Sequence, residues 1–103
     1  MNNNDFLWLV KWYAVHCNGD WEHGKSIHIG TIDNPGWSFS VNLNGTELEN
    51  ISFDSIEVNR SEENWLFCRL NNGFFEADCG INNLFEVINI FRKWASKYQK
   101  GTK

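Results

Sequence analysis

One stretch, Trp37-Ser38-Phe39-Ser40-Val41-Asn42-Leu43, decides the fold, because apolar and polar side chains alternate strictly along it. Successive side chains of a strand point to opposite faces of a sheet, so this alternation predicts a strand with one buried face. Such half-buried strands are typical of antiparallel sheets. The following Asn44-Gly45 favours a tight turn, and we expect it to close the strand as a hairpin.

The residues before this strand predict a second strand and the turn that joins the two. Residues 26–33 are rich in isoleucine, a β-branched residue that favours strands. Asn34-Pro35-Gly36-Trp37 has the pattern of a type II turn, because proline fixes φ at the second position and glycine permits a positive φ at the third.

Further strands are predicted downstream. Within residues 47–59 the apolar positions change parity between Phe53 and Ile56, so we expect one strand or two short strands with a break near Asp54-Ser55. Residues 64–70 are apolar at both parities, which predicts a central strand covered on both faces. Asn72-Gly73 then favours a turn, after which residues 74–78 pair back.

A helix is predicted near each end of the chain. Residues 5–17 and 83–99 both carry apolar side chains at helical spacing. Asn18-Gly19 favours the end of the first helix, and Asn83 with Glu86 resembles a capping box at the start of the last. The predicted apolar faces are Phe6, Leu9, Val10, Tyr13, Ala14 and Cys17 in the first helix, and Leu84, Val87, Ile88, Phe91, Trp94 and Ala95 in the last.

The order of these elements predicts an α+β fold: an N-terminal helix, an antiparallel meander of about five strands, and a C-terminal helix, with the helices packed on the sheet. The chain has 103 residues, so we expect a single domain spanning residues 1–103. We expect disorder at about residues 1–4 and 100–103.

Composition narrows the classes of partner and compartment. The net charge of −4 lacks the basic surplus that a nucleic-acid-binding protein needs, and no apolar run approaches the roughly 20 residues of a membrane span. The polar start is unlike a signal peptide, and three cysteines without a CxxC pair indicate a reducing compartment. We therefore expect a cytoplasmic protein, with a monomer favoured and no nucleic-acid or membrane partner.

Acidic side chains are concentrated in the middle of the chain. Residues 47–63 contain six acids and a single base, Arg60. An acidic patch steers basic partners toward a surface. It can equally be a solvated face that keeps the protein soluble, and the sequence leaves both interpretations open.

The densest polar cluster runs from His16 to His23 and offers four residues of types that bind metals: His16, Cys17, Asp20 and His23. Their spacing matches no established zinc signature. We expect Cys17, on the predicted apolar face, to be a small buried hydrophobe, and the same holds for Cys68 and Cys79. No nucleophile, base and oxyanion donors occur in a catalytic arrangement, so we expect no enzyme, no catalytic residue, no metal site and no cofactor.

The loop after the first helix is a candidate binding segment, because loops on rigid scaffolds commonly carry binding residues. Asp20, Glu22 and His23 are expected to be exposed there. For Trp21 the better interpretation is a core residue, since tryptophan is usually well buried.

Three stretches resemble the bacterial immunity protein 53 family: Trp-Leu-Val-Lys-Trp-Tyr at 8–13, Cys-Asn-Gly-Asp-Trp-Glu-His at 17–23, and Ile-Asp-Asn-Pro-Gly-Trp-Ser at 32–38. The resemblance continues in order through Arg60-Ser61-Glu62 to the final helix. It implies a small, non-enzymatic cytosolic antidote that binds and blocks the toxin domain of a polymorphic or contact-dependent toxin system.

The first hypothesis is therefore stoichiometric binding to one cognate toxin domain, with the acidic residues 47–63 as mimics of phosphate charge if the toxin is a nuclease. The alternative is a small metal- or ligand-binding domain, with hydrolase activity as its enzymatic form, built on His16, Cys17, Asp20 and His23. A third hypothesis is a structural oligomer that uses exposed tryptophans. The candidate toxin-binding residues are Asp20, Trp21, Glu22, His23, Asp33, Glu57, Glu62 and Glu63.

Overall fold

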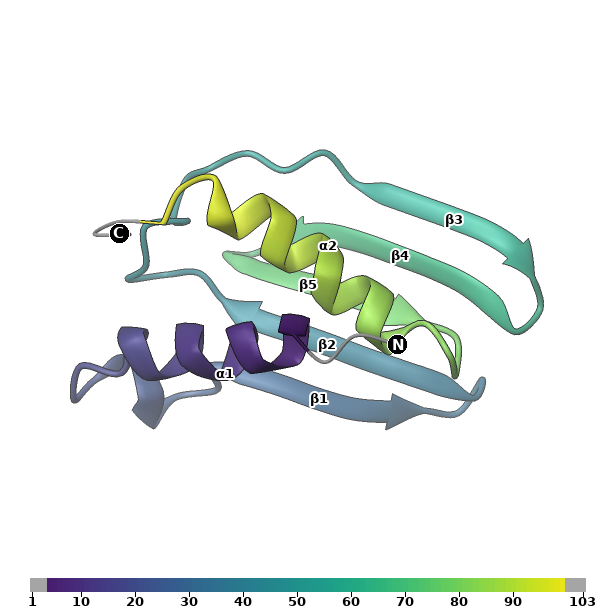
Figure 1. Cartoon of the computed structure of the whole chain (residues 1–103), viewed down its shortest axis with the longest axis horizontal. Coiled ribbons are helices and arrows are strands. Elements are labelled where there is room, and N and C mark those ends of the chain that lie inside the picture. The colour runs from purple at the N-terminus through teal and green to yellow at the C-terminus, as the bar shows by residue number, and fades with distance from the viewer. Residues whose placement is uncertain (1–3, 100–103) are drawn as a thin grey trace.

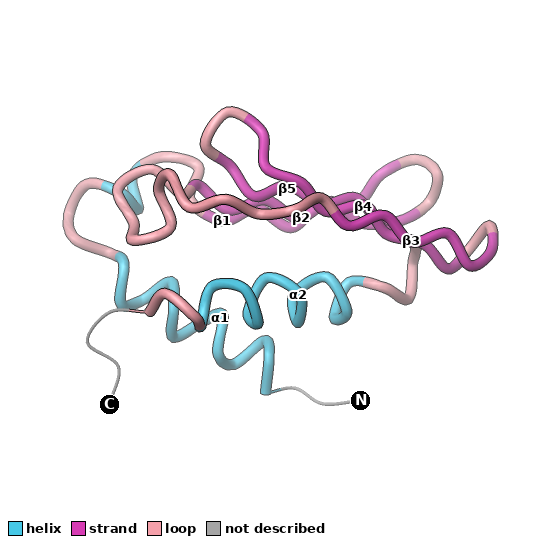
Figure 2. Tube along the Cα trace, turned by 90° about the horizontal axis from the view of Figure 1, so that it is seen from above, coloured by secondary structure: helices cyan, strands magenta, loops and turns pink. Residues whose placement is uncertain are grey.

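Five antiparallel strands form one sheet, and two helices pack on one of its faces (Figures 1 and 2). The computed structural model describes residues 4–99. The predicted disorder at residues 1–3 and 100–103 therefore lies outside the described residues, and Asn4 begins the first helix. No described helix has the length and apolar character needed to cross a membrane. The elements are α1 (Asn4–His16), the 3-10 turn η1 (Trp21–His23), β1 (Ile27–Ile32), β2 (Gly36–Asn42), β3 (Ile56–Ser61), β4 (Asn64–Asn71), β5 (Phe74–Cys79) and α2 (Leu84–Ser96).

The predicted α+β class is confirmed, and the strand order adds what the pattern could not predict. The order is β1-β2-β5-β4-β3. β2 alternates buried and half-buried side chains as predicted, but its partners are β1 and β5. The hairpin expected at Asn44-Gly45 is wrong: Gly45 turns the chain with a φ of +85°, yet the backbone N–H of Leu43 donates to the Gly73 carbonyl instead.

Residues 43–55, the crossover connection, carry the chain from β2 to the far edge of the sheet. The strand predicted over residues 47–55 is wrong, because these residues are irregular, although β3 does begin directly after the predicted break. Leu48 is fully buried, and Phe53 packs against the core. The Trp94 indole N–H donates to the Ser52 carbonyl at 3.0 Å. The apolar residues that suggested a strand instead anchor a crossing segment.

The core lies between the sheet and α2. The predicted apolar stripe of α2 is confirmed, since five of its six residues are buried and Leu84 is partly buried. Phe91 is central: its ring centroid lies 5.1 Å from that of Phe75, 5.4 Å from that of Trp12 and 6.0 Å from that of Phe39. Aromatic pairs at such separations add to the stability that burial provides.

The first helix has the predicted bounds to within one residue but buries a different face. Leu9 and Trp12 are buried, whereas Phe6, Val10 and Tyr13 are 42%, 50% and 39% exposed. The Trp12 ring meets Phe91 edge to face. Burial of an indole, the largest side chain, removes more apolar area from water than burial of any single side chain on the predicted face. The helix is therefore oriented by its tryptophans.

Residues 64–70 do form a strand, β4, but the prediction that both of its faces are covered is wrong, because the described helices cover one face. Leu66 and Cys68 face the helices and are buried, while Trp65 and Phe67 are half-buried on the other face. The cause is the layering: α1 and α2 lie on the same side of the sheet (Figure 2). Among residues 4–99, no helix lies over the opposite side.

The turn between β1 and β2 is not type II. It contains a cis Asn34–Pro35 bond, and Gly36 does not have a positive φ. Gly36 is instead the first residue of β2 and pairs with Ile32. A Cβ at this position would overlap the backbone carbonyl of Cys79. The glycine is therefore required for close packing rather than for the turn.

The start of α2 agrees with the sequence, but the bonds of a capping box do not form. The buried Asn83 side chain accepts the Trp65 backbone N–H at 3.2 Å and donates to Asn64 and Glu86. This amide ties β4 to the helix start. The helix ends at Ser96 rather than at residue 99.

Candidate protein-binding surface

The loop at the end of α1 is held by its own polar side chains. Gly19 has a φ of +92°, and the Asn18 side chain accepts the backbone N–H groups of Asp20 and Trp21, both at 3.0 Å. The Glu22 carboxylate accepts those of Asn18 and Gly19 at 2.9 and 2.7 Å. Backbone N–H groups at its own residue, Asn18 and Gly19 lower the pKa of Glu22. Glu22 therefore has a structural role in this loop.

Trp21 is a core residue, which is the interpretation that the sequence favoured. It is 7% exposed, its indole N–H donates to the Asn42 carbonyl at 3.1 Å, and its ring packs edge to face on Trp12. Asp20 and His23 on either side of it are exposed. The loop therefore offers two side chains to a partner rather than four.

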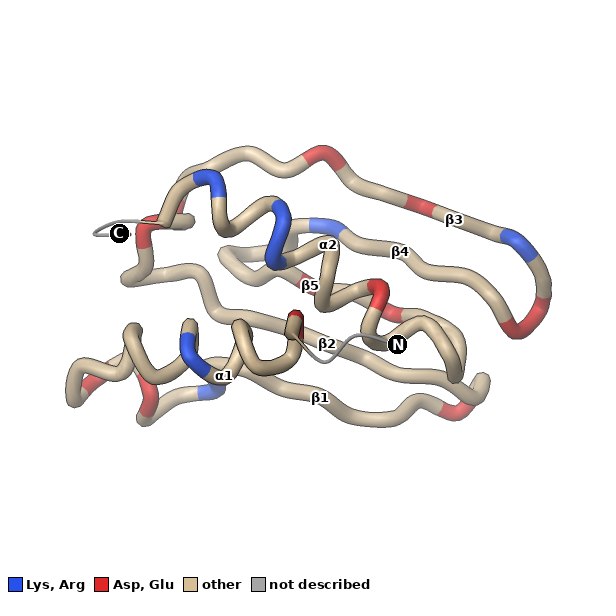
Figure 3. Tube along the Cα trace, in the orientation of Figure 1, with Lys and Arg blue, Asp and Glu red and all other residues tan. Residues whose placement is uncertain are grey.

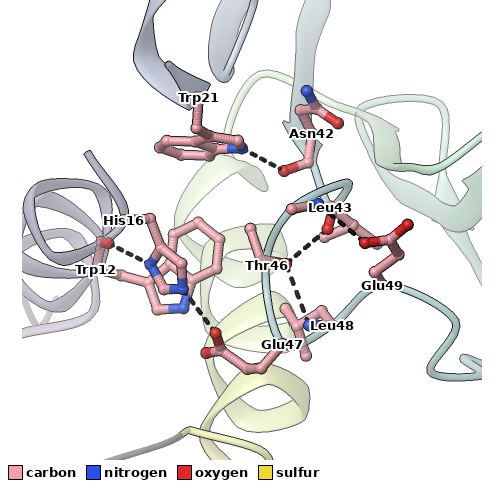
Figure 4. A network of polar contacts seen from close by, with 10 residues as sticks. Trp12, His16, Trp21, Asn42, Leu43, Thr46, Glu47, Leu48 and Glu49 are labelled. Atoms are coloured by element: carbon pink, nitrogen blue, oxygen red, sulfur yellow. Dashed lines mark hydrogen bonds and ion pairs between the residues drawn. The ribbon is translucent and has the colours of Figure 1, made fainter. Parts of the chain in front are cut away.

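His16 is fully engaged with groups of the protein. Its Nδ1 lies 2.8 Å from the Trp12 carbonyl oxygen and its Nε2 lies 2.8 Å from a Glu47 carboxylate oxygen. Both neighbours are acceptors, so a proton on either ring nitrogen has a partner within the protein. Figure 4 shows this contact joining the end of α1 to the crossover connection.

The four residues of the metal-binding alternative do not form a metal site. Cys17 is exposed, which corrects its predicted burial, because it lies beside the exposed Tyr13 and donates to the carbonyl of that residue. Nowhere in residues 4–99 do three or more His, Cys, Asp or Glu side chains form a group able to hold a metal ion. The metal-binding alternative thus has no support in the described structure.

The other two cysteines are buried as predicted. Burial raises the pKa of Cys68 to about 12 and that of Cys79 to about 11. Since the thiolate is the nucleophilic form, both thiols are unreactive at neutral pH.

The side of the sheet without helices, the open sheet face, is polar and acidic. Its centre is Arg69, which lies 3.2 Å from both Glu76 and Asp78 and stacks 4.9 Å from the Phe67 ring centroid. Serines of β2 stand beside these acids in the register. By strand parity, this face comprises His28, Ser38, Ser40, Glu57, Trp65, Phe67, Arg69, Glu76 and Asp78.

One end of the sheet gathers three of the predicted acids. Asp33 lies in the β1–β2 turn, and Glu62 and Glu63 lie in the β3–β4 turn. Both turns border a hollow of about 320 Å³ that is also lined by Trp65 and Ile81. We name Asp33, Glu62 and Glu63 the acidic end; Glu57 lies on the neighbouring part of the open sheet face.

Both layers carry charges of both signs (Figure 3), but they differ in which charges lack an ion-pair partner in the described chain. Lys11 lies on α1, and Lys93 lies on α2. The two arginines of the sheet are neutralised, Arg60 by Glu86 at 2.7 Å and Arg69 by its two acids. Within residues 4–99, by contrast, the carboxylates of Asp33, Glu57, Glu62 and Glu63 form no ion pair, so their charge is available to a partner.

The structure divides the eight predicted residues into two groups. The loop with Asp20 and His23 lies at one end of the long axis, and the acidic end lies at the other (Figures 1 and 3). Glu76, Asp78 and Trp65 were not predicted. The alternation of residues 74–79 could have predicted that Glu76 and Asp78 lie on the same face of a strand. The overall charge of that sheet face, however, depends on the pairing of β2 with β5.

Comparison with known proteins yields one match. A family model described as immunity protein 53 matches residues 6–96. The matched range covers both helices and the whole sheet. No curated protein and no solved structure matches the chain.

Proposed function

The chain belongs to the immunity protein 53 family, and we propose that it binds one cognate bacterial toxin domain and neutralises it by stoichiometric protein–protein binding rather than by catalysis. The observation that carries this proposal is the family match from α1 to α2. It is supported by an uncovered sheet face bordered by carboxylates that have no ion-pair partner in the described chain. The proposed setting is the cytoplasm of a bacterium with a polymorphic or contact-dependent toxin system.

We place the toxin on the acidic end and the adjoining open sheet face. A standard interface takes about 800 Å² from each partner, a patch roughly 30 Å across. The long axis of the protein measures 40 Å, so one such patch does not span both Asp20 and the acidic end. The acidic end has more unpaired carboxylates, and the hollow beside it exposes Ile81.

The chemistry of this surface fits a basic partner. Carboxylates at Glu57, Glu62 and Glu63 accelerate association with a positively charged surface, and a half-buried tryptophan such as Trp65 is the residue type most often found at the energetic centre of an interface. If the toxin is a nuclease, these carboxylates would occupy the positions of substrate phosphates. Access to the basic cleft would then be blocked without any chemical step.

The function is tested by co-expression with the toxin domain encoded beside this protein. We expect the wild-type protein to restore growth and to co-purify with the toxin. Absence of both effects would contradict the proposal.

The surface is tested by charge reversal. We expect Glu62→Lys with Glu63→Lys to weaken toxin binding about 10- to 100-fold, because two favourable charge interactions become repulsive. Asp20→Lys is the matched control at the opposite end and is expected to leave the dissociation constant within about twofold. If instead Asp20→Lys alone weakened toxin binding, the interface would be assigned to the loop after α1.

A further inference from the structure

β1 is an edge strand without the features that usually protect an edge. In the described chain it pairs with β2 alone, and residues 27–32 contain no Asp, Glu, Lys, Arg or proline. The opposite edge, β3, carries Glu57 and Arg60 and has a register irregularity near its end. Charges and bulges of this kind keep edges from pairing with other strands. β1 therefore remains able to accept another strand.

An apolar ridge of α1 borders the same edge. Phe6, Val10 and Tyr13, the ridge, line a groove of about 330 Å³ together with Ile27 and Ile29 of β1. These helix residues belong to the face that helical periodicity marked for burial, and the fold leaves them exposed. A bare strand edge and an uncovered apolar ridge thus lie side by side.

We propose that this edge pairs with the same edge of a second copy of the chain, which forms a twofold symmetric dimer. An axis perpendicular to the sheet sets the two β1 strands antiparallel and keeps both helix layers on one side. The same operation brings the two ridges toward each other above the seam. A single twofold rotation therefore covers both the β1 edge and the ridge. This favours a second copy of the chain as the partner that binds there.

The charges of this surface permit contact between identical copies. A twofold axis places like residues near one another, so a charged edge would repel itself. β1 contains no Asp, Glu, Lys or Arg, and its His28 lies on the open sheet face rather than on the side of the ridge. The groove holds one acid, Glu22, and one base, Lys25. The basic toxin proposed above is matched to the acidic end rather than to this neutral groove. The open sheet faces of both copies stay uncovered, so each can bind a toxin domain.

The test is sedimentation velocity of the full chain from about 1 to about 100 µM, where we expect a dimer with a dissociation constant of about 10 µM or lower. We expect Val10→Lys in the ridge and, separately, Thr31→Lys on the edge strand to weaken dimerisation at least about tenfold. Val15→Lys is the matched control: Val15 is 75% exposed on the same helix but does not line the groove. It is expected to leave dimerisation unchanged.

A protein that stays monomeric at the highest concentration would overturn the proposal. So would a loss of dimerisation with Val15→Lys equal to the loss with Val10→Lys. A monomeric protein that loses toxin binding through Val10→Lys would also overturn it, by assigning the groove to a segment of the toxin. Circular dichroism checks that each variant is folded; if Val10→Lys unfolds the helix, Thr31→Lys decides. Protection against the toxin by a monomeric variant separates this proposal from the proposed function.

Discussion

At the scale of single residues, the main difference among polar side chains is whether they already form hydrogen bonds or ion pairs within the protein. The Glu22 carboxylate accepts two backbone N–H groups, and both nitrogens of His16 are in contact with acceptors. Residues that look chemically active in sequence are thus structural. Glu62 and Glu63, which the sequence marks as candidate binding residues, carry carboxylates without an ion-pair partner among residues 4–99, at one end of the sheet.

Cysteine reactivity should follow burial. With a thiol reagent at neutral pH, we expect the folded protein to be modified at Cys17, which is exposed, and not at Cys68 or Cys79, whose pKa values burial raises to about 12 and about 11. Mass spectrometry of the labelled protein identifies the sites. Modification of Cys68 as fast as that of Cys17 would show that the core opens readily.

Gly36 should tolerate no side chain. We expect Gly36→Ala to lower the free energy of unfolding by about 3 kcal/mol, because its Cβ meets the carbonyl of Cys79 on the neighbouring strand. Gly24→Ala is the control, since a Cβ there meets no atom of the described chain within 4 Å, and its effect is expected within about 0.5 kcal/mol. Urea titration measures both; equal effects would rule out the close approach as the cause.

At the scale of elements, side-chain contacts join the crossover connection and β3 to parts of the chain that are distant in sequence. The crossover connection is fixed by Leu48, by the Ser52 carbonyl and by the contact between Glu47 and His16 (Figure 4). β3 is joined to α2 by Arg60 and Glu86. The contact between Arg60 and Glu86 ties the strand that leads into the β3–β4 turn to α2, and this turn carries two of the three residues of the acidic end.

Loss of the Leu48 side chain should destabilise the whole fold. We expect Leu48→Ala to cost about 3 kcal/mol of unfolding free energy, because it leaves a cavity at a fully buried position. Val15→Ala removes a comparable side chain from an exposed position and should change stability by less than about 0.5 kcal/mol. A small effect of Leu48→Ala in chemical denaturation would mean that the connection is not anchored there.

The ion pair between Arg60 and Glu86 should make a pH-dependent contribution. The hydrogen bond from Arg60 lowers the pKa of Glu86 below its ordinary value of 4.5, so the pair stabilises the folded state above about pH 4.5 and loses this effect as the pH falls through the lowered pKa. Since both groups are partly exposed, Glu86→Gln should cost about 0.5 kcal/mol at neutral pH. In urea titrations the difference in stability from wild type should shrink as the pH falls below about 4.5; a difference that stays constant as the carboxyl group becomes protonated would contradict this explanation.

The limits of sequence prediction are visible in particular elements. β2 and α2 have one clear periodicity, so their positions in the chain and their buried faces follow from local pattern, although the end of α2 does not. In α1 two adjoining faces are apolar, and the choice between Val10 and Trp12 depends on the room beside Phe91. Asp33 and Glu62 were predicted individually, but the proximity of their turns depends on a strand order that no local pattern contains.

At the scale of the whole molecule, the open sheet face and the turns beside it present carboxylates that have no ion-pair partner among residues 4–99, whereas Lys11 and Lys93 lie on the helices. This separation orients an approaching basic protein toward the sheet and its acidic end. The proposed dimer seam follows β1 and leaves that surface free. One chain can therefore carry two interfaces, a charged one for the toxin and an apolar one for its own copy.

The central claim is stoichiometric neutralisation, and titration of the purified toxin domain tests it most directly. Residual toxin activity is measured against the molar ratio of this protein to the toxin. The account predicts a linear fall that ends at one chain per toxin, whether the chain is monomeric or dimeric, and full activity when the two proteins are separated under denaturing conditions and the toxin is refolded. Inactivation by a small fraction of an equivalent, or no inhibition at any ratio, would contradict it.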